Sequence, residues 1–146
     1  VGCVVLDKQG NLTAGTSTGG MFKKRWGRIG DSPVIGAGTY ADNNSCAVSC
    51  TGHGEYFIRH AVAFDVCARY KYLKESVEKA ADYIIHTELN TNAGNVGLIA
   101  VDKLGNIAMP YNSGGMFRGF LYKEKGSPEI KKGCGIGKKI VVVGEK

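Results

Sequence analysis

Hydrophobic residues form short runs near both ends of the chain and recur at helical spacing in its middle. The apolar runs at residues 3–6 and 99–101 are each followed by a Gly-Asn turn and a second short run, the pattern of a β-hairpin. "VVLDKQGNLTAGTSTGGMFK" at 4–23 reappears as "IAVDKLGNIAMPYNSGGMFR" at 99–118, at a constant offset of 95 residues. We therefore expect two like hairpins lying side by side in one sheet.

The middle of the chain predicts two amphipathic helices, one within residues 54–73 and one within 75–89. Their apolar positions are Phe57, Ile58, Ala61, Val62, Phe64 and Ala68, then Val77, Ala80, Ala81, Ile84, Ile85 and Leu89. A glycine-rich loop at 27–40 and a strand at 43–52 precede them, and a further strand is expected at 117–122. Strands in two sets with helices between them predict an α+β architecture.

The length of 146 residues suits one modest hydrophobic core. We assign residues 1–125 to this unit and expect 126–146 to be a divergent tail or an edge strand. No apolar run approaches the roughly 20 residues that span a bilayer, so no membrane is expected as a partner. The net charge is +6, but the basic residues form short, separate groups without interleaved aromatic residues, and this pattern disfavours nucleic acid as a partner.

The five cysteines contain no C-x-x-C pair. Cys46 and Cys50 lie four residues apart and share one face of a strand with Val48. We expect buried, reduced thiols in a cytoplasmic protein. His53 and His60 lack a set of cysteine or carboxylate partners, so no metal site is expected.

The stretch "TSTGG" at 16–20 ends the first hairpin. Alternation along a strand puts the hydroxyls of Thr16 and Thr18 on one face, where they could serve a site. The other interpretation is a β-branched strand end followed by glycines that form a turn.

The stretch "GRIGDSP" at 27–33 places two opposite charges in one loop. Arg28 presents a planar fork for a carboxylate, and Asp31 can accept from an ammonium group, so an α-amino acid would satisfy both. The alternative is that Arg28 and Asp31 pair with each other.

The stretch "CTGHGE" at 50–55 joins a strand to a helix. Gly52 and Gly54 permit close approach of a reacting group, and backbone N–H groups with the Thr51 hydroxyl could stabilise a developing oxyanion. The alternative is an ordinary helix start with Thr51 or Gly52 near the cap. None of these stretches supplies a nucleophile with its own base. An N-terminal threonine would supply both, because its α-amine activates its own hydroxyl.

Four motifs together resemble the β subunit of the plant-type L-asparaginases (isoaspartyl peptidases), a family of N-terminal nucleophile hydrolases. They are "VGCVVLDKQGNLTAGTSTGG", "GRIGDSPVIGAGTYADN", "AVSCTGHGE" and "MPYNSGGMFRG", in the family's order over roughly residues 1–120. Such proteins are made as precursors that cut themselves before a threonine. The resemblance implies that this threonine, the nucleophile, immediately precedes Val1, and that the chain as written does not turn over substrate.

The resemblance also assigns roles to residues of this sequence. Thr18 would orient the nucleophile, and Thr51 with Gly52 would form the oxyanion hole. Arg28 would bind the substrate α-carboxylate and Asp31 its α-ammonium group. The full set of substrate-binding residues that it implies is Arg28, Gly30, Asp31, Thr51, Gly52 and Gly54.

The family fold is a four-layer αββα sandwich, of which this chain would supply roughly half. The partner implied is an α subunit from the same precursor, in an (αβ)2 heterotetramer, with asparagine or a β-aspartyl dipeptide as substrate. No cofactor is implied, and a structural alkali cation could not be assigned to residues of this chain.

Two alternatives stay open at this point. Glycosylasparaginases share the "GRxGDSP" and "TGxGE" patterns, although "STGG" and "NSGGMFRG" look more like isoaspartyl peptidases. A non-catalytic subunit or fragment that keeps only the fold is the other alternative. "FKKRWGR" at 22–28 departs from the usual pattern of both families, so this loop could alter substrate choice.

Overall fold

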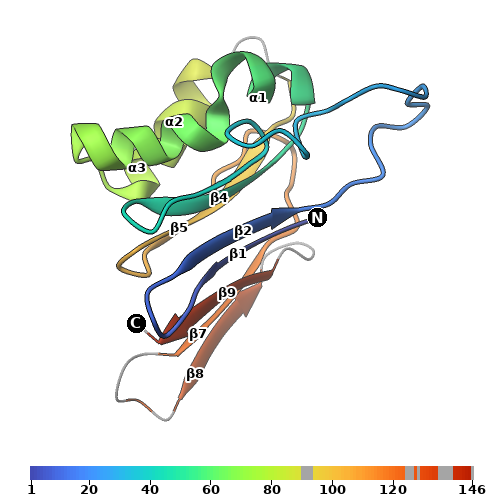
Figure 1. Ribbon diagram of the computed structural model, residues 1–146. Helices are drawn as coiled ribbons and strands as arrows, with labels where there is room; N and C mark the ends of the chain where they lie inside the picture. Colours follow the sequence, from blue (N-terminus) through green and yellow to red (C-terminus); the bar gives the residue numbers. More distant parts are fainter. Residues whose placement is uncertain (90–93, 124–126, 128, 135–139, 146) are drawn as a thin grey trace.

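Two β-sheets packed face to face, with helices on one outer side, make up the computed structural model of the chain (Figure 1). The structure describes residues 1–89, 94–123, 127, 129–134 and 140–145. Its elements are β1 (Gly2–Leu6), β2 (Leu12–Thr16), β3 (Thr39–Ala41), β4 (Cys46–Thr51), α1 (Gly54–His60), α2 (Val62–Ala68), the π-helical turn η1 (Arg69–Leu73), α3 (Val77–Tyr83), the π-helical turn η2 (Ile84–Glu88), β5 (Gly97–Asp102), β6 (Ile107–Ala108), β7 (Gly119–Lys123), β8 (Ile130–Cys134) and β9 (Ile140–Glu145). Mixed helices and strands confirm the α+β class.

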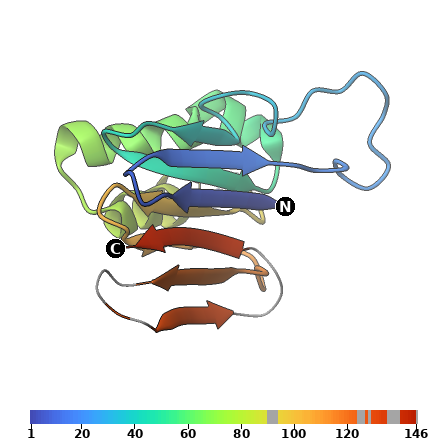
Figure 2. The same cartoon turned by 60° about the horizontal axis from the view of Figure 1, so that its bottom comes forward.

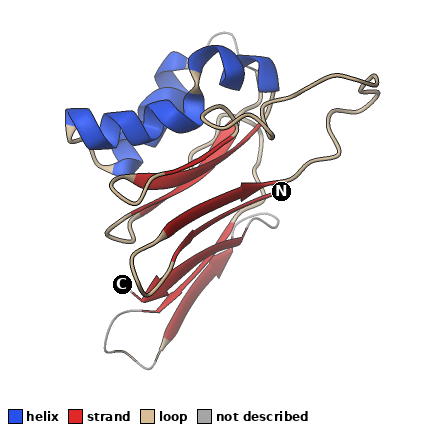
Figure 3. Cartoon of the chain, viewed as in Figure 1, coloured by secondary structure: helices blue, strands red, loops and turns tan. Residues whose placement is uncertain are grey.

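The two sheets differ in their strand order. The first sheet runs β2-β1-β9-β7-β8, and its five strands lie in a row in Figure 2. Its strand β9 is parallel to both β1 and β7. The second sheet runs β3-β4-β5-β6 with antiparallel neighbours, and the helices cover its outer face (Figure 3). No helix in the described part of the chain is long and apolar enough to cross a membrane.

The helix expected over 54–73 is interrupted at Ala61, which adopts the left-handed conformation with φ of 46°. Beyond it, the backbone N–H groups of Ala63 and Phe64 donate to the carbonyls of Ala37 and Gly36, at 3.1 and 2.9 Å. The loop before β3 thus supplies the acceptors that a continuous helix would have supplied. The break fastens α2 to that loop, which a periodicity argument could not anticipate.

The main core lies between the second sheet and the helices. Cys46, Val48 and Cys50 face the helices from β4, as the alternation along this strand predicted. Phe57 of α1 and Val66 of α2 are fully buried against them. Because β4 is buried on both faces, every residue from Cys46 to Cys50 is inaccessible.

A second core lies between the two sheets, and it corrects the expected placement of the repeated hairpins. Val4 and Leu6 of β1 pack against Ile99 and Val101 of β5, so the hairpins belong to opposite sheets. The prediction that they lie side by side in one sheet is wrong. The physical reason is that β5 pairs with β4 on one side and with β6 on the other, which leaves no free edge of β5 for the first hairpin.

The two hairpins nevertheless close with the same turn. Asp7 accepts hydrogen bonds from the backbone N–H groups of Gln9 and Asn11 at 2.9 and 2.7 Å. Asp102 accepts from those of Leu104 and Asn106 at 2.9 and 2.8 Å. The asparagine side chain also donates to the aspartate in each turn. These bonds, with that from the Asn11 side chain the largest, hold the pKa of Asp7 below its usual value.

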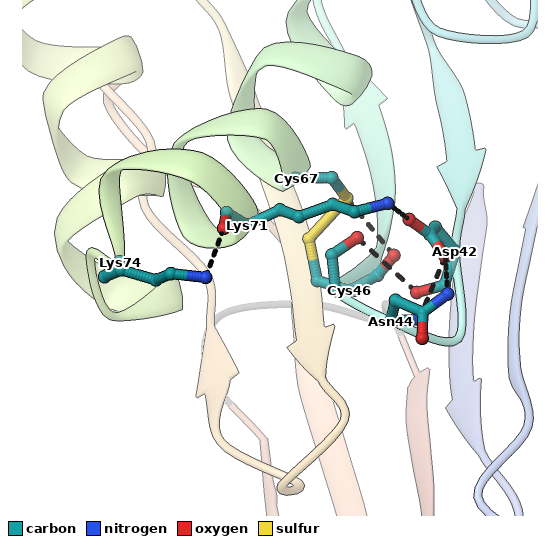
Figure 4. A network of polar contacts seen from close by, with 7 residues as sticks. Asp42, Asn44, Cys46, Cys67, Lys71 and Lys74 are labelled. Atoms are coloured by element: carbon teal, nitrogen blue, oxygen red, sulfur yellow. Dashed lines mark hydrogen bonds and ion pairs between the residues drawn. A yellow bond between two sulfur atoms is a disulfide. The ribbon is translucent and has the colours of Figure 1, made fainter.

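A disulfide joins Cys46 of β4 to Cys67 of α2, with their Cα atoms 5.5 Å apart (Figure 4). The expectation of reduced thiols is therefore wrong for this pair, whose 21-residue separation matches no cysteine motif. Cys3 and Cys50 remain thiols, and the side chain of Cys134 lies outside the described part of the structure. Nearby, the ammonium group of Lys71 in η1 pairs with Asp42 at 2.9 Å. The disulfide thus holds α2 to β4, and this ion pair holds η1 to the turn before β4.

Replacing Cys67 by alanine should lower the free energy of unfolding by about 3 kcal/mol, because the bridge closes a 21-residue loop in the unfolded chain. Chemical denaturation with and without a reductant measures this difference. Cys3→Ala is the matched control, since Cys3 remains a thiol. The free thiols are alkylated beforehand, so that the disulfide alone responds to the reductant. Equal stability of wild type with and without reductant would contradict the bridge.

The C-terminal segment forms two strands where one edge strand or a loose end was expected. β8 is the edge strand of the first sheet, whereas β9 lies inside the sheet, between β1 and β7. The β-branched residues in the run at 140–143 have a high propensity for strands.

Candidate active site

A cavity of about 620 Å³ opens where β2 and β4 end, next to the segment between β2 and β3 that projects from the body in Figure 1. All seven residues to which the family resemblance assigns a catalytic or substrate-binding role line this cavity. The lining consists of Val1, Thr16, Ser17, Thr18, Gly20, Met21, Lys24, Arg28, Ile29, Gly30, Asp31, Ser32, Pro33, Cys50, Thr51, Gly52 and Gly54. Three stretches far apart in the sequence therefore form one cavity.

The start of the chain is fixed in the cavity wall. The nitrogen of Val1 donates to the carbonyl of Ser17 at 2.7 Å, and the backbone N–H of Ser17 donates to the carbonyl of Val1 at 2.8 Å. This pair of bonds continues the β1–β2 ladder beyond Gly2 and Thr16. In the same register, a residue bonded to the nitrogen of Val1 would lie opposite Thr18, at the border of the cavity.

The two threonines at the end of β2 have different environments. The hydroxyl of Thr16 lies 2.8 Å from that of Ser49 and donates to the carbonyl of Gly38 at 3.2 Å. The hydroxyl of Thr18 accepts from the backbone N–H of Gly20 at 2.9 Å. Thr16 thus joins the sheets, while the Thr18 hydroxyl donates to none of the residues that the structure describes and can donate to a group in the cavity.

Arg28 pairs with Glu55 and not with Asp31, the partner that the alternative interpretation supposed. Its Nη2 lies 2.6 Å from Glu55 Oε1 and 3.7 Å from the sulfur of Met21. The hydrogen bond from Arg28 is the largest cause that holds the pKa of Glu55 below its usual value. Glu55 is the last residue of the stretch "CTGHGE". Its pairing with Arg28 could not be predicted from the sequence, because the two residues are 27 positions apart.

Asp31 is 7% exposed and sits between two glycines. A Cβ atom on Gly38 would stand 2.6 Å from its Oδ2, and a Cβ on Gly54 would stand 2.7 Å from its Oδ1. Its backbone carbonyl accepts from the N–H groups of Val34 and Gly38, at 2.9 and 3.2 Å. A side chain at either glycine would therefore displace the carboxylate from the cavity wall.

Thr51 is the last residue of β4, and Gly52 turns the chain with φ of 146°. A Cβ on Gly52 would stand 2.8 Å from the carbonyl oxygen of Asn95, so both conformation and space require glycine here. His53 occupies the N-cap position of α1, and no side chain caps this helix. The Thr51 hydroxyl forms no hydrogen bond with any other residue in the described part of the chain, so the cap interpretation gains no support.

A second cavity of about 390 Å³ lies on the other side of Val1, Thr51 and Gly52. Asn95, Ser113 and Phe117 are among its lining residues, and the last two belong to the glycine-rich exit of the second hairpin. From the sequence, that exit was recognised as part of the repeat and of a family motif, but none of its residues was given a role in the site. The residues at the ends of β1 and β4 are thus accessible from two sides.

The described residues contain no group of three histidine, cysteine, aspartate or glutamate side chains that could hold a metal ion. What the first cavity offers instead is a cationic fork, a carboxylate, a hydroxyl donor and a glycine backbone. This set can bind a ligand that carries both a carboxylate and an ammonium group, and can stabilise negative charge on a third atom.

The asparaginase family model matches residues 1–130. The chain is 52% identical over 122 residues to the isoaspartyl peptidase of Salmonella typhimurium. The aligned region covers 84% of this chain and 39% of that protein. It is 53% identical over 119 residues to the probable isoaspartyl peptidase/L-asparaginase 2 of Arabidopsis thaliana (82% and 36%). It is 46% identical over 120 residues to the isoaspartyl peptidase/L-asparaginase of Mus musculus (80% and 35%). The chain thus spans less than two fifths of each relative.

Proposed function

The chain belongs to the asparaginase family, and on this premise we propose that it is the β subunit of an amidohydrolase. The enzyme cleaves the side-chain amide of L-asparagine and the isopeptide bond of β-aspartyl dipeptides. The observation that carries the proposal is the single cavity that combines Thr18, Arg28, Asp31, Thr51 and Gly52. A scaffold without catalysis would have no need of this combination.

The nucleophile is the threonine directly before Val1. Two hydrogen bonds between Val1 and Ser17 support this assignment, because in their register the preceding residue lies opposite Thr18, at the border of the cavity. Its α-amine takes the proton from its hydroxyl, and Thr18 donates a hydrogen bond that orients the nucleophile. Autocatalytic cleavage of the precursor before this threonine releases the α-amine.

The substrate is held by its α-carbon substituents. Glu55 engages only Nη2 of Arg28, and Nε and Nη1 donate to none of the described residues, so the guanidinium group keeps donors for the α-carboxylate. The carboxylate of Asp31 accepts from the α-ammonium group. Gly30 and Gly54 line the same wall and leave room for the substrate.

The reaction passes through a tetrahedral oxyanion. The threonine hydroxyl attacks the side-chain amide carbon, and the Thr51 hydroxyl with the Gly52 N–H stabilises the negative oxygen. The C–N bond breaks, and the proton from the hydroxyl goes to the leaving nitrogen, which departs as ammonia or as an amino acid. Water then attacks the acyl-enzyme and releases aspartate.

The assembly follows from the same premise. We propose that an α subunit from the same precursor adds the fourth layer of an αββα sandwich, that two αβ pairs form an (αβ)2 heterotetramer, and that the enzyme is cytoplasmic and needs no cofactor. The face of the first sheet that points away from the helices supports the fourth layer. Cys3, Val5 and Leu121 are half-buried there, and no described helix covers them.

The proposal is tested on the protein expressed from the complete gene. Intact mass under denaturing conditions should give an α species and a β species that begins with threonine directly before Val1. Aspartate release should then be measured with L-asparagine and with β-aspartyl-leucine. Activity in an uncleaved chain would overturn the N-terminal nucleophile, and a cleaved protein without activity on either substrate would overturn the function.

A further inference from the structure

The loop of residues 21–24 brings a lysine to the mouth of the first cavity. The backbone N–H of Lys24 donates to the carbonyl of Met21 at 3.0 Å, and Lys23 adopts the left-handed conformation with φ of 59°. This tight turn carries the Lys24 side chain back over Gly20. Its ammonium group lies 3.3 Å from the point where a Cβ on Gly20 would stand, so the absence of a side chain at Gly20 makes room for it.

The ammonium group of Lys24 has a different status from the other charges of the cavity. Arg28 is engaged with Glu55, whereas Lys24 forms no ion pair or side-chain hydrogen bond with any residue in the described ranges. The neighbouring Lys23 does not line the cavity, and its ammonium group lies 5.7 Å from the centre of the Phe22 ring. Lys24 is thus the loop lysine that a ligand in the cavity can reach.

The volume of the cavity exceeds the needs of a free amino acid. At about 620 Å³ it has the size of sites that accommodate drug-sized ligands. The two substrate classes of the proposed function differ in their leaving group: asparagine releases ammonia, whereas a β-aspartyl dipeptide releases an amino acid that carries its own carboxylate. A second cation at the mouth of the cavity is complementary to that second carboxylate.

We propose that Lys24 is a specificity-determining residue that binds the C-terminal carboxylate of β-aspartyl dipeptides and favours them over asparagine. This inference rests on the proposed function, which it deepens by assigning the leaving-group side of the same cavity. The α-carboxylate remains with Arg28, so each of the two carboxylates of the dipeptide has its own cation.

The test compares three substrates on the enzyme expressed from the complete gene: β-aspartyl-leucine, its C-terminal amide and L-asparagine. Lys24→Met should lower the ratio of kcat/KM for the dipeptide to kcat/KM for its amide about tenfold, the effect of losing one charged hydrogen bond. Lys24→Arg should restore most of the ratio. Lys23→Met removes the same charge from the same turn and should leave the ratio unchanged.

The outcomes separate the two proposals. Wild type that hydrolyses none of the three substrates would overturn the proposed function and this inference with it. Wild type that hydrolyses them, with a ratio that Lys24→Met does not alter, would overturn the role of Lys24 alone. An equal fall of the ratio in Lys23→Met would mean that the net charge of the loop, and not a contact of Lys24, sets the preference.

Discussion

Replacing Thr51 by valine should lower kcat for both substrates by about 10²–10³-fold, the effect of removing one oxyanion-hole donor. Valine has nearly the shape of threonine, so the variant removes the hydroxyl and leaves the end of β4 in place. The hydroxyl of Thr51 forms no bond with another described residue, so no structural contact is lost with it. Because the donor acts on charge that develops after substrate binding, KM should change little.

The control for this substitution is Thr13→Val, the same change at an exposed position of β2. Its kcat and thermal midpoint should match those of wild type. The thermal midpoint of Thr51→Val should match them as well. If Thr51→Val retains the kcat of wild type, Thr51 does not donate to the oxyanion, and the second donor beside the Gly52 N–H must be another group.

Replacing Arg28 by alanine should raise KM for asparagine about a hundredfold, since charged hydrogen bonds contribute about 1.5–3 kcal/mol each and a forked contact loses two. Steady-state kinetics with asparagine measures this effect. Arg28→Lys keeps the charge but loses the planar fork, so its KM should lie between those of wild type and Arg28→Ala. An unchanged KM in Arg28→Ala would refute binding of the α-carboxylate by this residue.

Glu55 provides a second check on the same contact through pH. Its pKa is held below the usual 4.5 by Arg28, so the ion pair is present above pH 4.5 and is lost as the pH falls through the lowered value. If Glu55 positions the guanidinium group, KM of wild type should rise in that acidic range. Glu55→Gln should show no such rise, because glutamine does not titrate. Parallel profiles of the two proteins would contradict the positioning role.

The sequence by itself determined the local structure and the composition of the site. Both hairpin turns follow from an aspartate whose carboxylate reaches backbone N–H groups two and four residues later, an interaction that needs no distant partner. The apolar face of β4 followed in the same way from alternation. The set of candidate site residues came from three short stretches, whose glycines and charged side chains are chemically distinctive.

Only the tertiary structure decided how these pieces meet. It placed the repeated hairpins in opposite sheets, interrupted the first helix at Ala61 and joined Cys46 to Cys67. It also gave Arg28 the partner Glu55, 27 residues away in the chain, and brought Lys24 to the cavity. The physical reason is the same in each case: the groups that meet are separated along the chain by a number of residues that follows no helix or strand periodicity. Packing of the whole core sets their distance in space, and no local pattern records it.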